Sequence, residues 1–127
     1  MGITQTITIT ATPDEVYDAL MSSEKFAALT GAPAEIDAED GGEFSCFGGK
    51  ITGRQIENIA GKQILQSWRA GPWPDDVNST VRIELQANQD DTTITLTQSD
   101  FPDEMTEHLE DGWHKMYWQP LKAYLEK

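Results

Sequence analysis

The sequence predicts an α+β domain in which a curved antiparallel sheet of about six to seven strands wraps around one long C-terminal helix. Two observations predict this fold. Apolar and polar residues alternate over successive short segments between residues 34 and 98, and turn residues separate these segments. Residues 103–126 then carry apolar side chains at helical spacing. A chain of 127 residues suits about one domain, so we expect residues 1–127 to form a single domain.

The N-terminal part predicts one strand followed by two short helices. Residues 3–11 alternate isoleucines with threonines, as a half-buried strand does. Thr12 and Glu15 have the spacing of a capping box, and Pro13 suits the first helical position. A pair of serines then interrupts this helix. A second short helix follows and is expected to end before Gly31.

Six further strands are expected, because the apolar period changes to two from residue 34 onward. They span residues 34–38, 43–47, 50–58, 63–70, 78–87 and 92–98. Gly48-Gly49 is expected to form a two-residue hairpin turn, since glycine adopts positive φ without steric cost. Residues 60–62 and 88–91 are expected to form later turns. Successive strands at hairpin spacing predict an antiparallel meander.

The last helix is expected to begin at Pro102 and to run to about residue 126. Pro120 lacks an N–H group, so a bend is expected near residue 116. Helical spacing places Trp118 well away from the apolar face. The residues expected on that face are Leu109, Trp113, Met116, Tyr117, Pro120 and Tyr124.

The chain is strongly acidic, with 22 acidic and 9 basic residues and a formal charge of −13. Such a surface repels phosphate backbones and anionic lipid, so we expect neither nucleic acid nor membrane as a partner. We interpret the charge as a solubilising surface, with a docking face for a basic partner as the alternative. Cys46 is the single cysteine, so no internal disulfide forms. With no secretory pattern, these features predict a cytoplasmic protein.

Catalytic motifs are absent or weak, so we expect no cofactor and no metal. His108 and His114 lie six positions apart, about 240° around a helix, and cannot chelate one metal. Cys46 is interpreted as a buried small apolar group rather than a nucleophile. His114 with Asp111 is a candidate acid–base pair, although a solvated helix face is the favoured interpretation.

Short motifs spread along the whole chain carry a family resemblance. In order, they are Phe44 to Gly53 (FSCFGGKITG), residues 66–69 (QSWR) with Trp73-Pro74, Gly112-Trp113, Tyr117-Trp118, and Pro120 to Lys122. With this ordered set, essentially all 127 residues resemble the family related to the C-terminal domain of the activator of heat-shock protein 90 ATPase. This family belongs to the START-like (SRPBCC) superfamily, whose fold is the helix-grip.

The resemblance implies a helix-grip fold and no shared catalytic residues. The eukaryotic activators of this family are co-chaperones that contact the chaperone through two domains, and this chain resembles the C-terminal one. The wider superfamily encloses apolar ligands between sheet and helix. The implied partners are therefore a small apolar ligand and a chaperone of the heat-shock protein 90 class.

The aromatic residues are the candidate binding site, because four tryptophans give a chain of this size a large apolar surface with polar handles. Plain core packing is the alternative interpretation of each. Trp73, between prolines, and Trp118, off the apolar helix face, are candidate contacts with a partner protein. The candidates for a cavity between sheet and helix are Phe44, Phe47, Trp68, Trp73, Trp113, Met116 and Tyr117.

Together these observations favour a non-enzymatic domain that binds a small apolar ligand in a cavity between sheet and helix. The alternative is a chaperone-linked protein-interaction module. A small hydrolase or cyclase that uses His114 and Asp111 is the third hypothesis, and it ranks last because fold alone does not confer activity.

Overall fold

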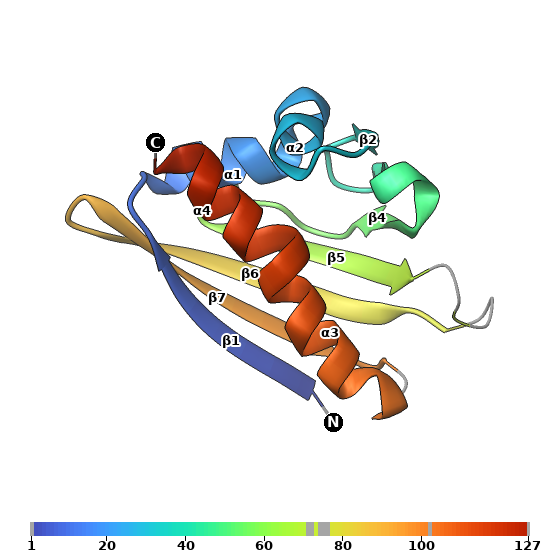
Figure 1. Ribbon diagram of the computed structural model, residues 1–127. Helices are drawn as coiled ribbons and strands as arrows, with labels where there is room; N and C mark the ends of the chain where they lie inside the picture. Colours follow the sequence, from blue (N-terminus) through green and yellow to red (C-terminus); the bar gives the residue numbers. More distant parts are fainter. Residues whose placement is uncertain (1, 71–72, 74–76, 102, 127) are drawn as a thin grey trace.

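A computed structural model describes residues 2–70, 73, 77–101 and 103–126. Within these residues, one sheet holds seven antiparallel strands in the order β1-β7-β6-β5-β4-β3-β2. They are β1 (Gly2–Ile9), β2 (Ala34–Ile36), β3 (Glu43–Cys46), β4 (Ile51–Gln55), β5 (Gln63–Ala70), β6 (Ser79–Asn88) and β7 (Asp91–Ser99). The C-terminal helix crosses one face of this sheet diagonally (Figure 1). The predicted α+β helix-grip fold class is confirmed.

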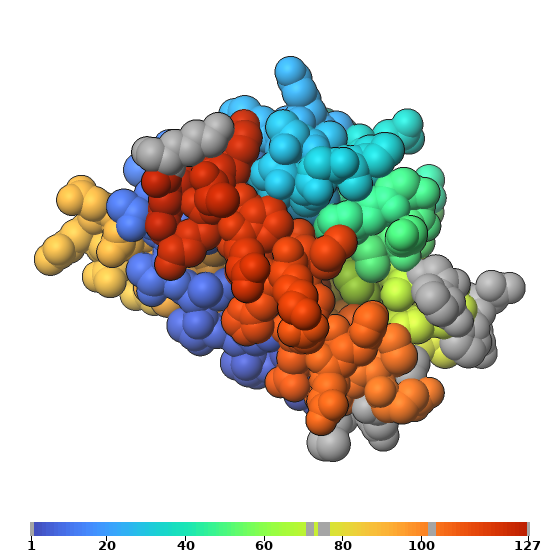
Figure 2. Space-filling view, in the orientation of Figure 1, coloured from blue at the N-terminus to red at the C-terminus, as the bar shows by residue number. Residues whose placement is uncertain are grey.

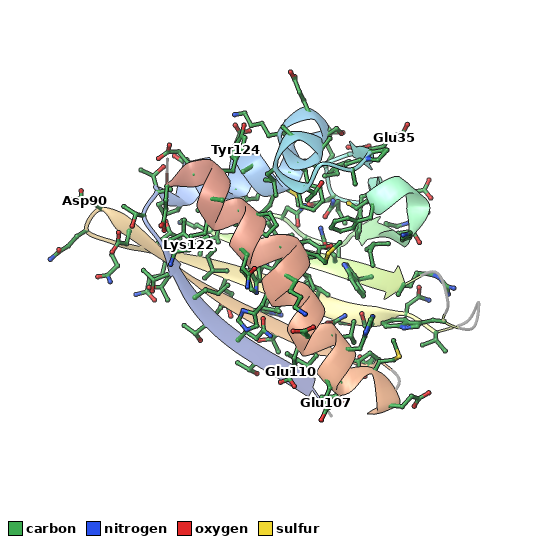
Figure 3. All side chains as sticks on the ribbon, in the orientation of Figure 1. Glu35, Asp90, Glu107, Glu110, Lys122 and Tyr124 are labelled. Carbon is green, nitrogen blue, oxygen red and sulfur yellow. The ribbon has the colours of Figure 1, made fainter. Side chains whose placement is uncertain are left out.

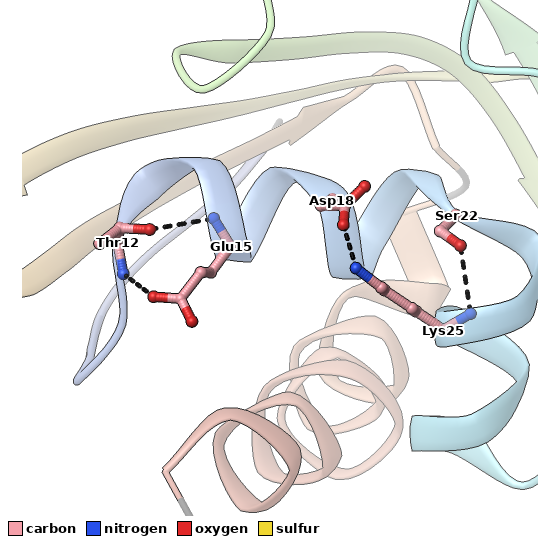
Figure 4. Close-up of polar contacts among 5 residues, drawn as sticks. All are labelled: Thr12, Glu15, Asp18, Ser22 and Lys25. Atoms are coloured by element: carbon pink, nitrogen blue, oxygen red, sulfur yellow. Dashed lines mark hydrogen bonds and ion pairs between the residues drawn. The ribbon is translucent and has the colours of Figure 1, made fainter.

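Two short helices follow β1, as predicted: α1 (Pro13–Met21) and α2 (Ser23–Thr30). The capping box is present, because Thr12 Oγ1 accepts from the Glu15 N–H at 3.2 Å and the Thr12 N–H donates to Glu15 Oε1 at 3.0 Å (Figure 4). An ion pair between Lys25 and Asp18 joins the two helices (Figure 4). Gly31, with φ of 73°, ends α2 in the left-handed conformation.

Replacing Thr12 with alanine should lower the free energy of unfolding by about 1 kcal/mol, because the Glu15 N–H loses its acceptor. Urea denaturation followed by circular dichroism measures the change. Glu15→Gln is the matched control, since glutamine keeps an oxygen for the Thr12 N–H, and it should change stability much less. Equal losses in the two variants would contradict a reciprocal capping box.

The turn between β3 and β4 differs from the prediction of a two-residue turn. β3 ends at Cys46 and β4 begins at Ile51, so four residues connect them. Both glycines have positive φ, as expected, but Phe47 also has φ of 56°. The Phe47 ring lies 5.8 Å from the ring of Phe26 and 5.6 Å from that of Tyr117. We attribute the longer turn to this burial, because the ring leaves the strand direction to enter the core.

The C-terminal helix consists of a 3₁₀ turn (Asp103–Met105), α3 (Thr106–Gly112), a π-helical segment (Trp113–Trp118) and α4 (Gln119–Leu125). Its predicted start at Pro102 lies outside the described residues. Where a bend near residue 116 was expected, the structure has the π-helical segment, in which the Gln119 N–H bonds to the carbonyl of His114. This wider turn directly precedes Pro120, which has no N–H for an α-helical bond to Met116.

The core lies between the C-terminal helix and the inner face of the sheet. The strand residues that are essentially inaccessible there include Ile3, Ile9, Ile64, Val81, Ile94 and Leu96. The helix contributes Leu109, Trp113, Tyr117, Trp118 and Leu121. No helix in the described part of the chain is long and apolar enough to cross a membrane.

Two predicted helix positions are wrong. Trp118 was expected away from the apolar face and is only 2% exposed, whereas Met116 was expected inside and is 48% exposed. Both residues lie in the π-helical segment, where the rotation per residue is smaller than the 100° of an α-helix. A projection at 100° per residue therefore assigns the wrong faces at these two positions.

Candidate functional site

Four aromatic rings meet where the C-terminal helix crosses β5. Trp113 is central: its ring centre lies 4.2 Å from Tyr117, 5.5 Å from Trp118 and 5.6 Å from Trp68. The Trp68 and Trp118 rings are stacked against Trp113 at interplanar angles of 30° and 20°. We call Trp68, Trp113, Tyr117 and Trp118 the aromatic cluster. The π-helical segment supplies three of its members.

Buried hydrogen bonds fix the two helix tryptophans of the aromatic cluster. Trp113 Nε1 donates to Gln98 Oε1 at 2.8 Å, and Gln98 Nε2 donates to Ser79 Oγ at 2.9 Å. Trp118 Nε1 donates to Gln5 Oε1 at 2.9 Å. Each indole has its polar group satisfied at one orientation, so both rings are held in fixed orientations.

Sequence reasoning missed the glutamines that hold these indoles. The available signal was positional, because Gln5 and Gln98 occupy inward positions of β1 and β7 that otherwise carry isoleucine, leucine or threonine. A polar residue at such a position needs a partner inside the core. An indole on the C-terminal helix is that partner in both cases.

A cavity of about 400 Å³ lies between the C-terminal helix, β4, β5 and the turn after β3. We call it the apolar cavity. Figure 2 shows the hollow between the orange-red helix and the green turn, with yellow-green atoms of β5 at its floor. Its apolar wall consists of Phe47, Ile51, Trp68, Ala70, Leu109, Gly112, Trp113, Met116 and Tyr117. The other lining residues in the described part of the chain are Lys50 and His108.

Five of the seven predicted cavity residues line the apolar cavity, and two do not. Phe47, Trp68, Trp113, Met116 and Tyr117 line it. Phe44 instead covers Gly53 on the neighbouring strand. Trp73 packs edge-on against Trp68 at 5.7 Å.

The exposure expected of Trp73 and Trp118 as partner contacts is wrong, since they are 5% and 2% exposed. For Trp118 the cause is the π-helical segment. Trp73 is drawn back onto β5, because its N–H bonds to the Ala70 carbonyl at 3.1 Å and Arg69 Nη2 donates to its carbonyl at 2.8 Å. The rest of the proline-flanked loop predicted at residues 71–75 lies outside the described residues.

Sequence reasoning also missed Lys50, His108 and Gly112 as lining residues. His108, Gly112 and Met116 follow one another at intervals of four along the helix, so they form one edge of the apolar cavity. A Cβ atom added to Gly112 would meet no heavy atom within 4 Å. Glycine inside a helix costs about 1 kcal/mol relative to alanine, and here it leaves the cavity wall open.

Burial keeps two ionisable groups neutral beside the aromatic cluster. It raises the pKa of the Cys46 thiol from 9.0 to about 12, in accord with the interpretation of Cys46 as a buried apolar group. Burial also raises the pKa of Tyr117, nearby Cys46 adds to this shift, and a hydrogen bond with the Trp68 side chain opposes it. Neither group supplies an anionic nucleophile at neutral pH.

These shifts predict lower stability in alkali. In the unfolded chain the Cys46 thiol ionises from about pH 9, whereas in the folded protein it stays neutral to about pH 12. The neutral, buried thiol therefore contributes its full share to the free energy of unfolding below pH 9, and this contribution is lost as the pH rises toward 12. Urea denaturation at pH 8, 9, 10 and 11 measures this loss. Cys46→Ala should flatten the slope, and an unchanged slope would contradict the raised pKa.

The two residues of the candidate acid–base pair, His114 and Asp111, do not lie in an enclosed site. His114 and Asp111 are both exposed on the helix, and neither lines the apolar cavity. Asp111 pairs instead with Lys115 at 3.0 Å. In the described part of the chain, no group of three or more histidines, cysteines and carboxylates is placed to hold a metal ion.

A second hollow, the outer groove, lies on the opposite face of the sheet across β2 to β5. It measures about 730 Å³. Among the described residues, its ionisable lining side chains are Glu35, Asp37, Glu43 and Arg54. Glu43 and Arg54 approach each other at 3.6 Å. Three carboxylates and one guanidinium make this groove a negative surface.

A curved antiparallel sheet closed by a C-terminal helix, with an aromatic-lined cavity between them, defines a START-like helix-grip domain. The model of the protein family described as "Activator of Hsp90 ATPase homolog 1-like protein" matches residues 10–126 of this chain. The chain therefore belongs to this family.

Individual relatives agree with this assignment. The chain is 28% identical over 120 residues to the mouse activator of 90 kDa heat shock protein ATPase homolog 1. The aligned region covers 94% of this chain and 36% of the mouse protein. It is 30% identical over 111 residues to the Dictyostelium discoideum homolog, covering 87% and 29% respectively. The crystal structure of an HSP90 activator from Plasmodium falciparum superposes with a TM-score of 0.93 at 24% identity, covering 99% of this chain and 96% of that one.

Proposed function

We propose that this domain is a chaperone-linked interaction module whose partner is a chaperone of the heat-shock protein 90 class. Family membership supports the proposal: the match extends over residues 10–126, and the mouse and Dictyostelium relatives are named as activators of that chaperone's ATPase. This was the alternative to ligand binding in the sequence analysis, and the comparisons favour it.

The proposal concerns binding first and stimulation of the ATPase second. The chain spans about a third of the length of the curated relatives it matches, with 36% of the mouse protein and 29% of the Dictyostelium protein covered. We therefore propose that it engages the chaperone through one site, and that any change in ATP turnover follows from that contact.

Acidic side chains lie on separate parts of the surface. Figure 3 shows Asp90 at the tip of the β6–β7 hairpin, Glu35 on β2 at the opposite end, and Glu107 and Glu110 on α3. Net charge of −13 steers the whole molecule toward a basic partner. Local acidic side chains then determine which face docks. The two candidate docking faces are the outer groove and the acidic first part of α3.

Titration calorimetry with the heat-shock protein 90 class chaperone from the same organism tests the proposal at low and high salt. We expect binding that weakens as salt increases, together with altered ATP turnover. Glu35→Lys with Glu43→Lys reverses charge at the outer groove, and Glu107→Lys with Glu110→Lys is the matched pair on α3. One pair should weaken binding much more than the other. No binding and unchanged turnover would refute the proposal.

A second candidate function is binding of a small apolar ligand, and the apolar cavity is the observation that favours it. Its volume of about 400 Å³ lies within the range of roughly 300–1,000 Å³ that small-molecule sites occupy. Four aromatic rings line it, and the half-exposed Met116 lies at its edge. The neutral fluorophore N-phenyl-1-naphthylamine is a suitable probe.

Binding of this probe should raise its fluorescence and the melting temperature of the protein. Gly112→Leu should abolish both effects, because the new side chain enters open space in the cavity wall without meeting a neighbour within 4 Å of its Cβ. The variant itself should melt no lower than the parent. Undiminished probe binding by a folded Gly112→Leu variant would remove the apolar cavity as the binding site.

A further inference from the structure

We propose that the apolar cavity selects a planar aromatic compound that carries one anionic group, such as an aromatic carboxylate. The inference rests on the second candidate function and specifies its ligand class. It follows from three features of the cavity: the charge at its edge, the shape of its aromatic wall and the glycine that keeps it open.

The first feature is the sign of the charged side chains that line the apolar cavity. The chain has 22 acidic and 9 basic residues, yet none of the carboxylates in the described part of the chain lines this cavity. Lys50 and His108 are its lining residues with basic side chains, one from the turn before β4 and one from α3. Both are exposed, so they stand at the solvent side of an otherwise apolar wall.

This local charge opposes the field of the whole protein. A net charge of −13 repels an approaching anion, so an anionic ligand needs a cation at the binding site itself. A lysine ammonium beside an apolar wall provides a charge-assisted hydrogen bond to a carboxylate. The outer groove, with Glu35, Asp37 and Glu43, offers the opposite charge and would reject the same compound.

The second feature is the shape of the wall. Trp68 and Trp113 are stacked at 5.6 Å with 30° between their planes, and Tyr117 lies 4.2 Å from Trp113. Flat rings fixed by neighbouring rings and hydrogen bonds favour a flat partner, because aromatic rings gain most from offset stacking and edge contacts. A planar aromatic body therefore fits this wall better than a branched aliphatic one.

The third feature is the open edge at Gly112. His108, Gly112 and Met116 lie along one side of the helix, and the middle position has no side chain. The lack of any heavy atom within 4 Å of an added Cβ marks free space at this point. The opening lies on the same edge as His108, so a ligand can place its ring inside and its anionic group toward the Lys50 ammonium.

A matched pair of fluorophores tests the inference. 1-Anilinonaphthalene-8-sulfonate and N-phenyl-1-naphthylamine share one aromatic skeleton, and only the first is an anion. We expect the anion to bind about tenfold more tightly to the parent protein. Lys50→Gln should remove most of that preference by weakening binding of the anion, with a much smaller effect on the affinity for the neutral probe. Lys62→Gln is the control, because Lys62 lies in the turn before β5 and does not line the apolar cavity.

The outcomes separate this inference from the function on which it rests. If neither probe binds the folded parent, the apolar cavity is not a ligand site and both proposals fail. If both probes bind equally, or if Lys50→Gln and Lys62→Gln behave alike, only the anionic preference fails. Displacement of the anionic probe by 2-naphthoate but not by 2-naphthylmethanol would support the carboxylate class directly. Equal displacement by the two compounds would overturn it.

Discussion

Trp113→Ala should lower the free energy of unfolding by about 3–5 kcal/mol, the largest loss expected from a single truncation in this chain. The Trp113 ring contacts Trp68, Tyr117 and Trp118, and only 2% of the residue is exposed. Removing it opens a void next to the apolar cavity and deprives buried Gln98 Oε1 of its donor. Urea denaturation followed by far-ultraviolet circular dichroism measures the loss.

Two further variants separate the causes of that loss. Trp113→Phe keeps most of the ring surface but leaves Gln98 Oε1 unpaired, so it should cost about 1–3 kcal/mol. Met116→Ala, on the same helix but 48% exposed, should change stability by less than about 1 kcal/mol. A Trp113→Ala variant no less stable than Met116→Ala would show that the aromatic cluster contributes little to folding.

Gly53→Ala is the second substitution with a large expected effect. Gly53 lies in β4 between Phe44 of β3 and Trp68 of β5. An added Cβ would collide with the Ser67 carbonyl oxygen and lie 2.6 Å from Phe44 Cζ. Because a backbone oxygen cannot yield as the end of a side chain can, the sheet itself must shift. We expect a loss of about 3 kcal/mol or more.

Gly112→Ala is the matched control for Gly53→Ala. It also adds one methyl group to a glycine, but in a helix and in open space. Alanine has the higher helix propensity, so stability should rise by up to about 1 kcal/mol. Thermal and urea denaturation of the two variants should therefore move in opposite directions. Similar small losses in both would mean that β4 tolerates a side chain at residue 53.

The fold could be predicted because several local patterns agreed with one another. The capping box at Thr12 and Glu15, the end of the second helix before Gly31 and the alternation in β5 to β7 were all predicted, and all three are present. What failed was rotation within the C-terminal helix. Pro120 indicates an irregularity near residue 116 but does not distinguish a bend from a π-helical turn, so Trp118 and Met116 were assigned to the wrong faces.

The candidate site could be predicted only in part, for a related reason. Aromatic residues identified the cavity wall, because large rings gather wherever a sheet and a helix leave space between them. Lys50 and His108 could not be assigned to it, since their positions depend on a turn longer than expected and on the rotation of α3. Gly112 appeared in the sequence as part of a motif, and only the structure shows the free space beside it.

Strand β1 forms one edge of the sheet, and this edge influences the tendency of the protein to aggregate. Within the described residues, β1 pairs with β7 on one side only, and its eight residues, GITQTITI, include neither a charge nor a proline. Such an edge is a template for intermolecular pairing and amyloid-like aggregation. At pH 7 the charge of −13 keeps molecules apart. Near the isoelectric point of about 4.3 that repulsion is smallest, so we expect self-association through the β1 edge to be strongest there.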